Sequence, residues 1–143
     1  MKPDCPLCRQ DGGAVLWRGP QLRVVEVGDA DYPGYTRVIW REHVAEMTDL
    51  DAAARAELME AVWTVERVQR EVLGPDKVNL ASLGNMVPHL HWHVIPRWRG
   101  DRHFPDAIWA AAPPDRDPAA RQERRQDIEA RLEQYRRSLA QAL

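Results

Sequence analysis

Residues 89–97 read HLHWHVIPR and place three histidines at alternate positions of an otherwise apolar segment. The chain of 143 residues contains only 5 histidines, so this spacing is a distinctive pattern. Side chains on a β-strand alternate between its two faces, which puts the three histidines on one face and the apolar residues on the other. We therefore expect the apolar face to enter the core and the imidazoles to line an open surface.

Several interpretations of this histidine face are open from the residues alone. The histidines can be ordinary surface side chains, or His91 and His93 can hold a catalytic zinc ion with a third ligand. They can also form a nucleophilic site, because neutral imidazole is abundant near neutral pH and becomes a good leaving group once phosphorylated. A mixed arrangement would place one histidine on a structural zinc ion. We favour the nucleophilic interpretation, because lone histidines are common and alternating triplets are rare.

The composition indicates a single domain without a strong preference for polyanions. The formal net charge is −2, from 20 lysine and arginine residues against 22 aspartate and glutamate residues. We therefore expect neither nucleic acid nor a membrane as a partner, and any phosphate binding must be local.

No segment reaches the roughly 18 apolar residues of a membrane span or resembles a signal peptide, which predicts a cytoplasmic protein. Cys5 and Cys8 have the spacing of a metal-binding turn or a redox pair.

Turn signals and β-branched residues predict five strands. The expected strands are residues 14–19, 22–27, 36–40, 77–84 and 89–97. Gly19 and Pro20 form a turn signal between the first two strands, so these should make a hairpin, and we expect the last two strands to pair. The sheet is predicted to be an antiparallel meander.

A long central helix is predicted between the third and fourth strands. Apolar residues recur at helical spacing from Leu50 to Val72. Thr48 and Asp51 have the spacing of a capping box that would start this helix, and Gly74 would end it.

A second helical pattern lies at the end of the chain. Its apolar stripe consists of Ile128, Leu132, Tyr135 and Leu139. We therefore divide the chain into residues 1–112, the main domain with its amino-terminal cysteine turn, and residues 113–143, an amphipathic helix. This helix would pack on the same domain or on a dimer partner.

The segment HLHWHVIPR resembles the His-φ-His-φ-His signature of the histidine triad (HIT) family, in its bacterial branch of nucleotide hydrolases and transferases. KVNLASLGN (residues 77–85) resembles the family's asparagine strand and glycine loop, and VIWREHVAEMTDL (residues 38–50) its strand, histidine and capped helix. CPLC (residues 5–8) resembles the amino-terminal cysteine pair of many bacterial members. The resemblance covers roughly residues 5 to 109. It implies an α+β, HIT-like fold with a five-stranded antiparallel sheet, a central helix and a homodimer.

The resemblance also implies an enzyme that acts at the α-phosphate of a purine nucleotide or nucleotide conjugate, such as a dinucleoside polyphosphate or a nucleoside phosphoramidate. His91 would be the nucleophile and form a covalent nucleotidyl-histidine, with no cofactor required for catalysis. His93 would contact the phosphate oxygens or the leaving group, and His89 would support the site or bind a metal. The implied phosphate contacts are Asn79, Gly84 and Asn85.

Resemblance to zinc-containing bacterial members implies a structural zinc ion as well. Its ligands would be Cys5, Cys8, His43 and His89, a set suited to four-coordinate zinc. The alternative is a pair of free thiols, with His89 left for catalysis.

Two positions depart from the family pattern. Tyr35 stands where many members carry a fourth histidine, and Met86 stands where a hydroxyl residue often donates to phosphate. The acidic residue expected to bind ribose is Asp29 or Asp31. These departures leave open a second class of function, a nucleotide-binding sensor or interaction module with little turnover, beside the enzyme and the zinc hydrolase.

Overall fold

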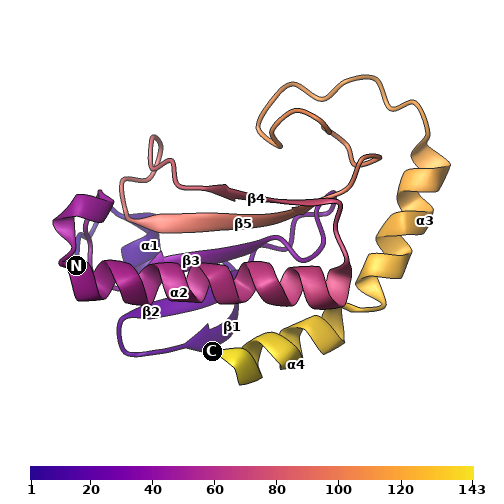
Figure 1. The fold of residues 1–143 in the computed structure, drawn as a ribbon. Coiled ribbons are helices and arrows are strands. Elements are labelled where there is room, and N and C mark those ends of the chain that lie inside the picture. The colour runs from indigo at the N-terminus through magenta and orange to yellow at the C-terminus, as the bar shows by residue number, and fades with distance from the viewer.

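The computed structural model describes residues 1–143 as a five-stranded antiparallel sheet with the long helix α2 across one face (Figure 1). The strands are β1 (Ala14–Arg18), β2 (Leu22–Glu26), β3 (Thr36–Trp40), β4 (Lys77–Ala81) and β5 (His91–Arg97). The helices are α1 (Pro6–Arg9), α2 (Ala52–Val68), α3 (Pro118–Glu129) and α4 (Leu132–Ala142), with short turns η1 (Met47–Asp49) and η2 (Gln69–Leu73) on either side of α2. All five predicted strands are present, and the α+β class is confirmed. None of the helices combines the length and the apolar character needed to cross a lipid bilayer.

The strand order places the histidine strand inside the sheet. The order is β1-β2-β3-β5-β4, so the first three strands form a meander and β5 pairs with β3 while β4 takes the edge. The predicted hairpin of β1 with β2 and the predicted pairing of β4 with β5 are both confirmed. The strand β3 pairs with His91–Val94 of β5 and the strand β4 with His93–Arg97, so each residue of β5 has a partner strand on at least one side.

The main core lies between α2 and the sheet. Leu58, Val62 and Val65 of α2 are fully buried and belong to the same apolar cluster as Val38 of β3 and Val94 of β5. Full burial of one such side chain stabilises the fold by about 1.5–3 kcal/mol. The apolar alternation of β5 is therefore used as expected, and its histidine face points away from α2.

The start of α2 differs from the prediction. Asp51 is the N-cap residue, and its carboxylate accepts a hydrogen bond from the backbone N–H of Ala54 at 2.8 Å. A capping box is present one turn earlier, at the start of η1, where the side chains of Glu46 and Asp49 each accept a hydrogen bond from the backbone N–H of the other residue. Thr48 lies inside η1 and does not cap α2. Both patterns have the same three-residue spacing, so the sequence alone did not separate them.

The carboxyl-terminal segment forms two helices, α3 and α4, instead of one. The break lets the apolar side of α4 pack against α2, where Tyr135 and Leu139 are fully buried. The hydroxyl group of Thr36 donates to the Gly34 carbonyl, and a bond of 2.6 Å joins it to the Tyr135 hydroxyl. Within this chain α4 thus completes the core on the side opposite the histidines. The domain boundary near residue 112 stays a prediction.

Candidate functional site

The candidate site lies on the face of β3 and β5 that points away from α2. His91 and His93 are only 8% and 5% exposed, so the expectation that they line an open surface is wrong. The amino-terminal turn around α1 borders His91, and the ring of Trp109 contacts His93 edge-on with 5.0 Å between ring centroids. These two distant segments cover the histidine face, which strand periodicity cannot indicate.

His91 is held by a backbone hydrogen bond that decides which of its nitrogens is free. The Nδ1 of His91 lies 2.6 Å from the carbonyl oxygen of His89. A carbonyl can only accept, so Nδ1 carries the proton and Nε2 keeps its lone pair. The imidazole therefore presents an unprotonated nitrogen away from its own backbone.

His93 has a different partner. Its Nδ1 lies 2.5 Å from the hydroxyl oxygen of Tyr35. The rings of His91 and His93 meet edge-on with 4.8 Å between centroids. Tyr35, which stands where many HIT proteins carry a fourth histidine, thus contacts the triad through His93.

Burial keeps both imidazoles neutral. Desolvation lowers the pKa of His91 below its ordinary value. The bond to the His89 carbonyl raises this pKa in part, and the charge of Arg37 lowers it further. Desolvation also lowers the pKa of His93 to about 3, and the neighbouring His91 and Arg37 act in the same direction. Burial raises the pKa of Tyr35, so this residue stays a phenol at neutral pH. The site therefore holds two neutral imidazoles and a neutral phenol.

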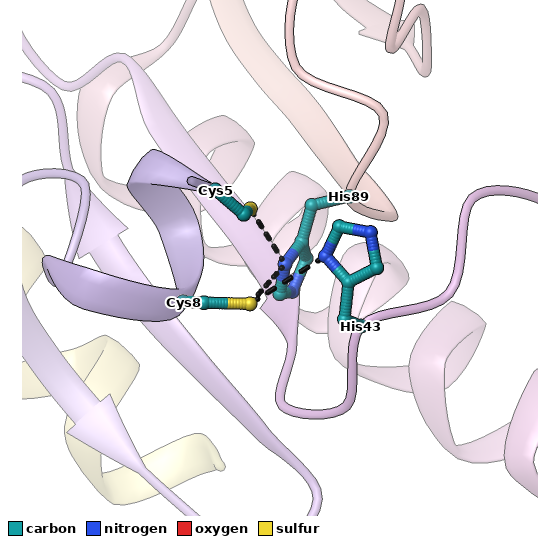
Figure 2. A group of neighbouring side chains, drawn as sticks. All are labelled: Cys5, Cys8, His43 and His89. Atoms are coloured by element: carbon teal, nitrogen blue, oxygen red, sulfur yellow. Dashed lines mark hydrogen bonds between the residues drawn. The ribbon is translucent and has the colours of Figure 1, made fainter. Parts of the chain in front are cut away.

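His89 is fully buried and belongs to a separate cluster with two cysteines and His43. Figure 2 shows Cys5 and Cys8 approaching His89 from the turn around α1, with His43 on the loop after β3. The Nδ1 of His89 lies 3.4 Å from the Sγ of Cys5 and 3.5 Å from the Sγ of Cys8. The Nδ1 of His43 lies 3.5 Å from the Sγ of Cys8.

The geometry of this cluster fits a four-coordinate metal. The four ligand atoms all lie within 4.8 Å of one another. In tetrahedral zinc coordination, a sulfur and a nitrogen ligand stand about 3.5 Å apart, which follows from bonds of about 2.3 and 2.0–2.1 Å. The Nε2 of His89 donates to the Trp40 carbonyl at 2.7 Å, so its Nδ1 lone pair faces the sulfurs as a ligand would. The cluster can therefore hold a metal, and it includes neither His91 nor His93.

The three predicted phosphate contacts, Asn79, Gly84 and Asn85, have different surroundings. The side-chain oxygen of Asn79 accepts a hydrogen bond of 2.7 Å from Arg97, which itself forms a buried ion pair with Asp101. Gly84 adopts a left-handed backbone with φ +75°, a conformation that favours glycine, and Asn85 is exposed. Met86 is 95% exposed and brings no donor.

The two candidate ribose ligands lie in local contacts of their own. Asp29 accepts a hydrogen bond from the backbone N–H of Asp31, and Asp31 pairs with Arg121 at 3.3 Å. Neither contact involves the triad. The sequence interpretation also missed Arg37, whose position on β3 opposite His93 follows only from the strand register.

Comparison with known proteins points to one family. The family model described as HIT domain matches residues 13–100. An AP-4-A phosphorylase of Mycobacterium tuberculosis (strain H37Rv) is 32% identical over 107 residues, which cover 71% of this chain and 55% of that protein. An asymmetrical bis(5'-nucleosyl)-tetraphosphatase of Schizosaccharomyces pombe is 29% identical over 83 residues, covering 54% of this chain and 46% of that protein. The chain thus spans about half the length of the curated relatives it matches.

A solved structure agrees with this family over most of the chain. The crystal structure of a histidine triad protein from Bradyrhizobium japonicum has a TM-score of 0.66 and 31% sequence identity. The match covers 85% of this chain and 91% of that one. The similarity therefore extends beyond the triad to nearly the whole fold.

The neutral His93 predicts a stability that falls on acidification. Its pKa is about 3 in the folded chain and 6.5 in the unfolded chain, so between these values only the unfolded chain binds a proton. Stability must then decrease as the pH falls through this window, by at most about 1.4 kcal/mol per pH unit for one group. Urea unfolding across the window should show a steeper decline for the wild type than for His93→Gln. A constant difference between the two proteins would contradict this account.

Proposed function

The chain belongs to the histidine triad (HIT) family, and from this premise we propose that it hydrolyses or transfers at the α-phosphate of a nucleotide conjugate. The observation that carries the proposal is the 2.6 Å bond from His91 Nδ1 to the His89 carbonyl, which leaves Nε2 as a free nucleophile. The names of the two curated relatives favour a dinucleoside polyphosphate over a nucleoside phosphoramidate.

In the proposed reaction, the Nε2 lone pair of His91 attacks the α-phosphorus, and the bond to the leaving oxygen breaks. The product is a nucleotidyl-His91 intermediate in which Nδ1 still donates to the carbonyl. Water or another acceptor then attacks the same phosphorus and releases the nucleotide, with His91 Nε2 as the leaving nitrogen. Neutral imidazole suits both steps, because protonated Nε2 could not attack and a phosphorylated ring leaves readily.

His93 would act as a hydrogen-bond donor in this reaction. In this proposal the Tyr35 hydroxyl donates to Nδ1 of His93, so the proton of the ring resides on Nε2. This N–H stabilises negative charge that develops on the phosphate or the leaving group. With a pKa of about 3, His93 carries no extra proton at neutral pH that it could give to a leaving group. A polyphosphate leaving group depends less on receiving a proton than an amine leaving group does. This supports the dinucleoside polyphosphate class.

The second candidate function is a nucleotide-binding sensor with little turnover. The lack of a donor at Met86 favours it, because this reduces the hydrogen-bond donors available to a transferred phosphate. The zinc-hydrolase alternative has no such support. The cluster that fits a metal contains neither His91 nor His93, the residues that would have to bind a catalytic ion.

Substitution of the nucleophile tests the proposed enzyme. We expect His91→Ala to lower kcat/KM for a dinucleoside tetraphosphate by about 10⁴-fold or more, since loss of a covalent nucleophile removes the reaction path. Intact-protein mass after brief mixing and alkaline quenching should show one adenylyl group on the wild type and none on His91→Ala.

His103→Gln is the matched control, because His103 bonds the hydroxyl of Tyr32 outside the triad. It should keep both the adduct and most of the activity. Tight nucleotide binding without turnover or adduct in the wild type would favour the sensor instead.

We also propose that the cluster of Cys5, Cys8, His43 and His89 binds a structural zinc ion. Two soft thiolates and two imidazole nitrogens at near-tetrahedral separations form a closed set without an open coordination position. The ion would fasten the amino-terminal turn to the residue that begins the triad. Its contribution would be structural, and no step of the reaction above passes through it.

The zinc proposal predicts one metal ion per chain. Elemental analysis of protein purified without chelator should find stoichiometric zinc in the wild type and in His103→Gln, and none in Cys5→Ser or His43→Gln. Bound zinc at 100 times its dissociation constant stabilises a protein by about 3 kcal/mol, so the variants should unfold at lower urea concentration. Equal zinc content in all four proteins would rule out these ligands.

The partner proposed for this chain, apart from the nucleotide, is a second copy of itself. Trp63 on α2 is 53% exposed, Leu80 of the edge strand β4 is 38% exposed, and Leu83 in the loop that follows β4 is 55% exposed. An exposed strand edge with apolar side chains is a common site of association. We place the dimer contact on α2 and β4.

A charge introduced into this surface should separate the copies. We expect the wild type to sediment as a dimer and Trp63→Glu as a monomer, because an unpaired carboxylate cannot be buried cheaply. Val15→Glu, on the opposite edge strand β1, is the control and should remain dimeric. A monomeric wild type at micromolar concentration would overturn the proposal.

A further inference from the structure

Arg37 lies on the histidine face of the sheet, beside the proposed nucleophile. It is the register partner of His93 across the β3–β5 pair, and the neighbouring pair joins Ile39 with His91. Alternation along β3 puts Arg37 and Ile39 on the same face as the two histidines and sends Val38 into the core under α2. A guanidinium group is therefore built into the site from a central strand of the sheet.

The guanidinium of Arg37 is poorly paired within the chain. Its Nε is shielded from solvent and has no hydrogen-bond partner, and its Nη1 makes one long bond of 3.3 Å to the carbonyl of Gly12. No carboxylate forms an ion pair with it. Shielding a charged group without partners is costly, so a site that keeps one this way is suited to receive an anion.

A cavity adjoins this unpaired group. It has a volume of about 340 Å³, and both Arg37 and His91 line it. The opposite wall comes from the amino-terminal turn, with Leu7, Gln10 and Gly12, and no acidic residue borders the space. A ligand that occupies the cavity therefore lies beside both His91 and Arg37.

The other groups at the triad cannot balance the charge of a phosphate. His91 has its Nδ1 proton on the His89 carbonyl, His93 is neutral, Tyr35 is a phenol, and Asn79 is an uncharged amide. Arg97 itself is committed to the buried ion pair with Asp101. A phosphodiester that reacts at His91 carries a full negative charge and gains more as the new bond forms. Among the residues that line the cavity, Arg37 is the one positively charged side chain, and no carboxylate pairs with it.

We propose that Arg37 binds the phosphate that His91 attacks, with N–H groups of its guanidinium donating to two non-bridging oxygens. The two parallel N–H groups of an arginine match two oxygens of a phosphate, which a lysine cannot reproduce. The inference rests on the proposed function for the identity of the reacting phosphate. The inference assigns one positive charge, that of Arg37, to this phosphate, since the side chains of Met86 and Asn79 are uncharged.

The competing explanation is a structural role. The guanidinium lies 5.8 Å from the ring centroid of Tyr35, in the range of a cation–π contact, and it also reaches Gly12. A purely structural Arg37 would affect all ligands alike, whereas an anion-binding Arg37 discriminates by charge. The test therefore compares ligands that differ only in a phosphate.

Titration calorimetry with AMP and with adenosine separates the two roles. We expect Arg37→Met to weaken the binding of AMP by about 10- to 100-fold and to leave the binding of adenosine unchanged. Arg37→Lys should recover only part of the loss. Arg41→Met removes the same charge from an exposed position beyond the end of β3 and should bind AMP like the wild type.

Three results would overturn the inference. The first is unchanged AMP affinity in Arg37→Met, the second is an equal loss for adenosine, and the third is an equal loss in Arg41→Met. If Arg37→Met does not fold, the wild type still provides a measurement. The Nε–H resonance of Arg37, assigned by its absence from Arg37→Lys, should shift when AMP is added and not when adenosine is added. No difference between the two ligands would also overturn the inference.

The adenylyl adduct separates this inference from the proposed function. A wild type that forms the adduct while Arg37→Met binds AMP normally contradicts the role of Arg37 alone. A wild type that forms no adduct while its AMP binding depends on Arg37 contradicts the proposed reaction and retains the anion site. In an active enzyme, kcat/KM of Arg37→Met should fall at least as far as its AMP affinity.

Discussion

One residue, His89, connects the amino-terminal turn with the proposed nucleophile. Its carbonyl oxygen accepts the Nδ1 hydrogen bond of His91, while its imidazole faces the thiols of Cys5 and Cys8. The remaining ring nitrogen bonds the carbonyl of Trp40, so every polar group of the side chain has a fixed direction. Because the ring is held from both of its nitrogens, the residue whose carbonyl defines the tautomer of His91 is itself fixed in place. The triad thus depends on a residue that takes no part in bond making.

The sequence predicted the parts of the site that follow from local periodicity. Alternation on one strand was enough to put His91 and His93 together and to send Val94 into the core, because both depend only on the two-residue repeat of a strand. His89 precedes the strand β5 and lies in the cysteine cluster instead. The capping of α2 shows where local patterns become ambiguous. Two overlapping three-residue spacings compete there, and the choice of Asp51 over Thr48 depends on how the chain enters the helix.

Non-local contacts explain what the sequence could not predict. The burial of His91 and His93 comes from the turn around α1 and from Trp109, which are far away in the chain. The orientation of the Asn79 amide likewise depends on Arg97, since the two side chains meet across the β4–β5 pair and Arg97 donates to the amide oxygen. Arg37 carried no motif, and only the register of β3 against β5 puts it opposite His93. Register is set by the packing of the whole sheet and not by a single segment.

The contact between Tyr35 and His93 bears on which nitrogens of His91 and His93 carry protons. In the proposed site the Tyr35 hydroxyl donates to Nδ1 of His93, so the ring carries its own proton on Nε2. His91 is fixed in the opposite tautomer by the His89 carbonyl, with its proton on Nδ1. Two imidazoles whose centroids are 4.8 Å apart therefore present complementary groups, one a lone pair and the other an N–H. A nucleophile and a donor are what phosphoryl transfer needs on adjacent sides of one phosphate. Burial makes this arrangement possible because it keeps both rings neutral, and the same burial leaves the negative charge of the phosphate to be balanced from a neighbouring strand.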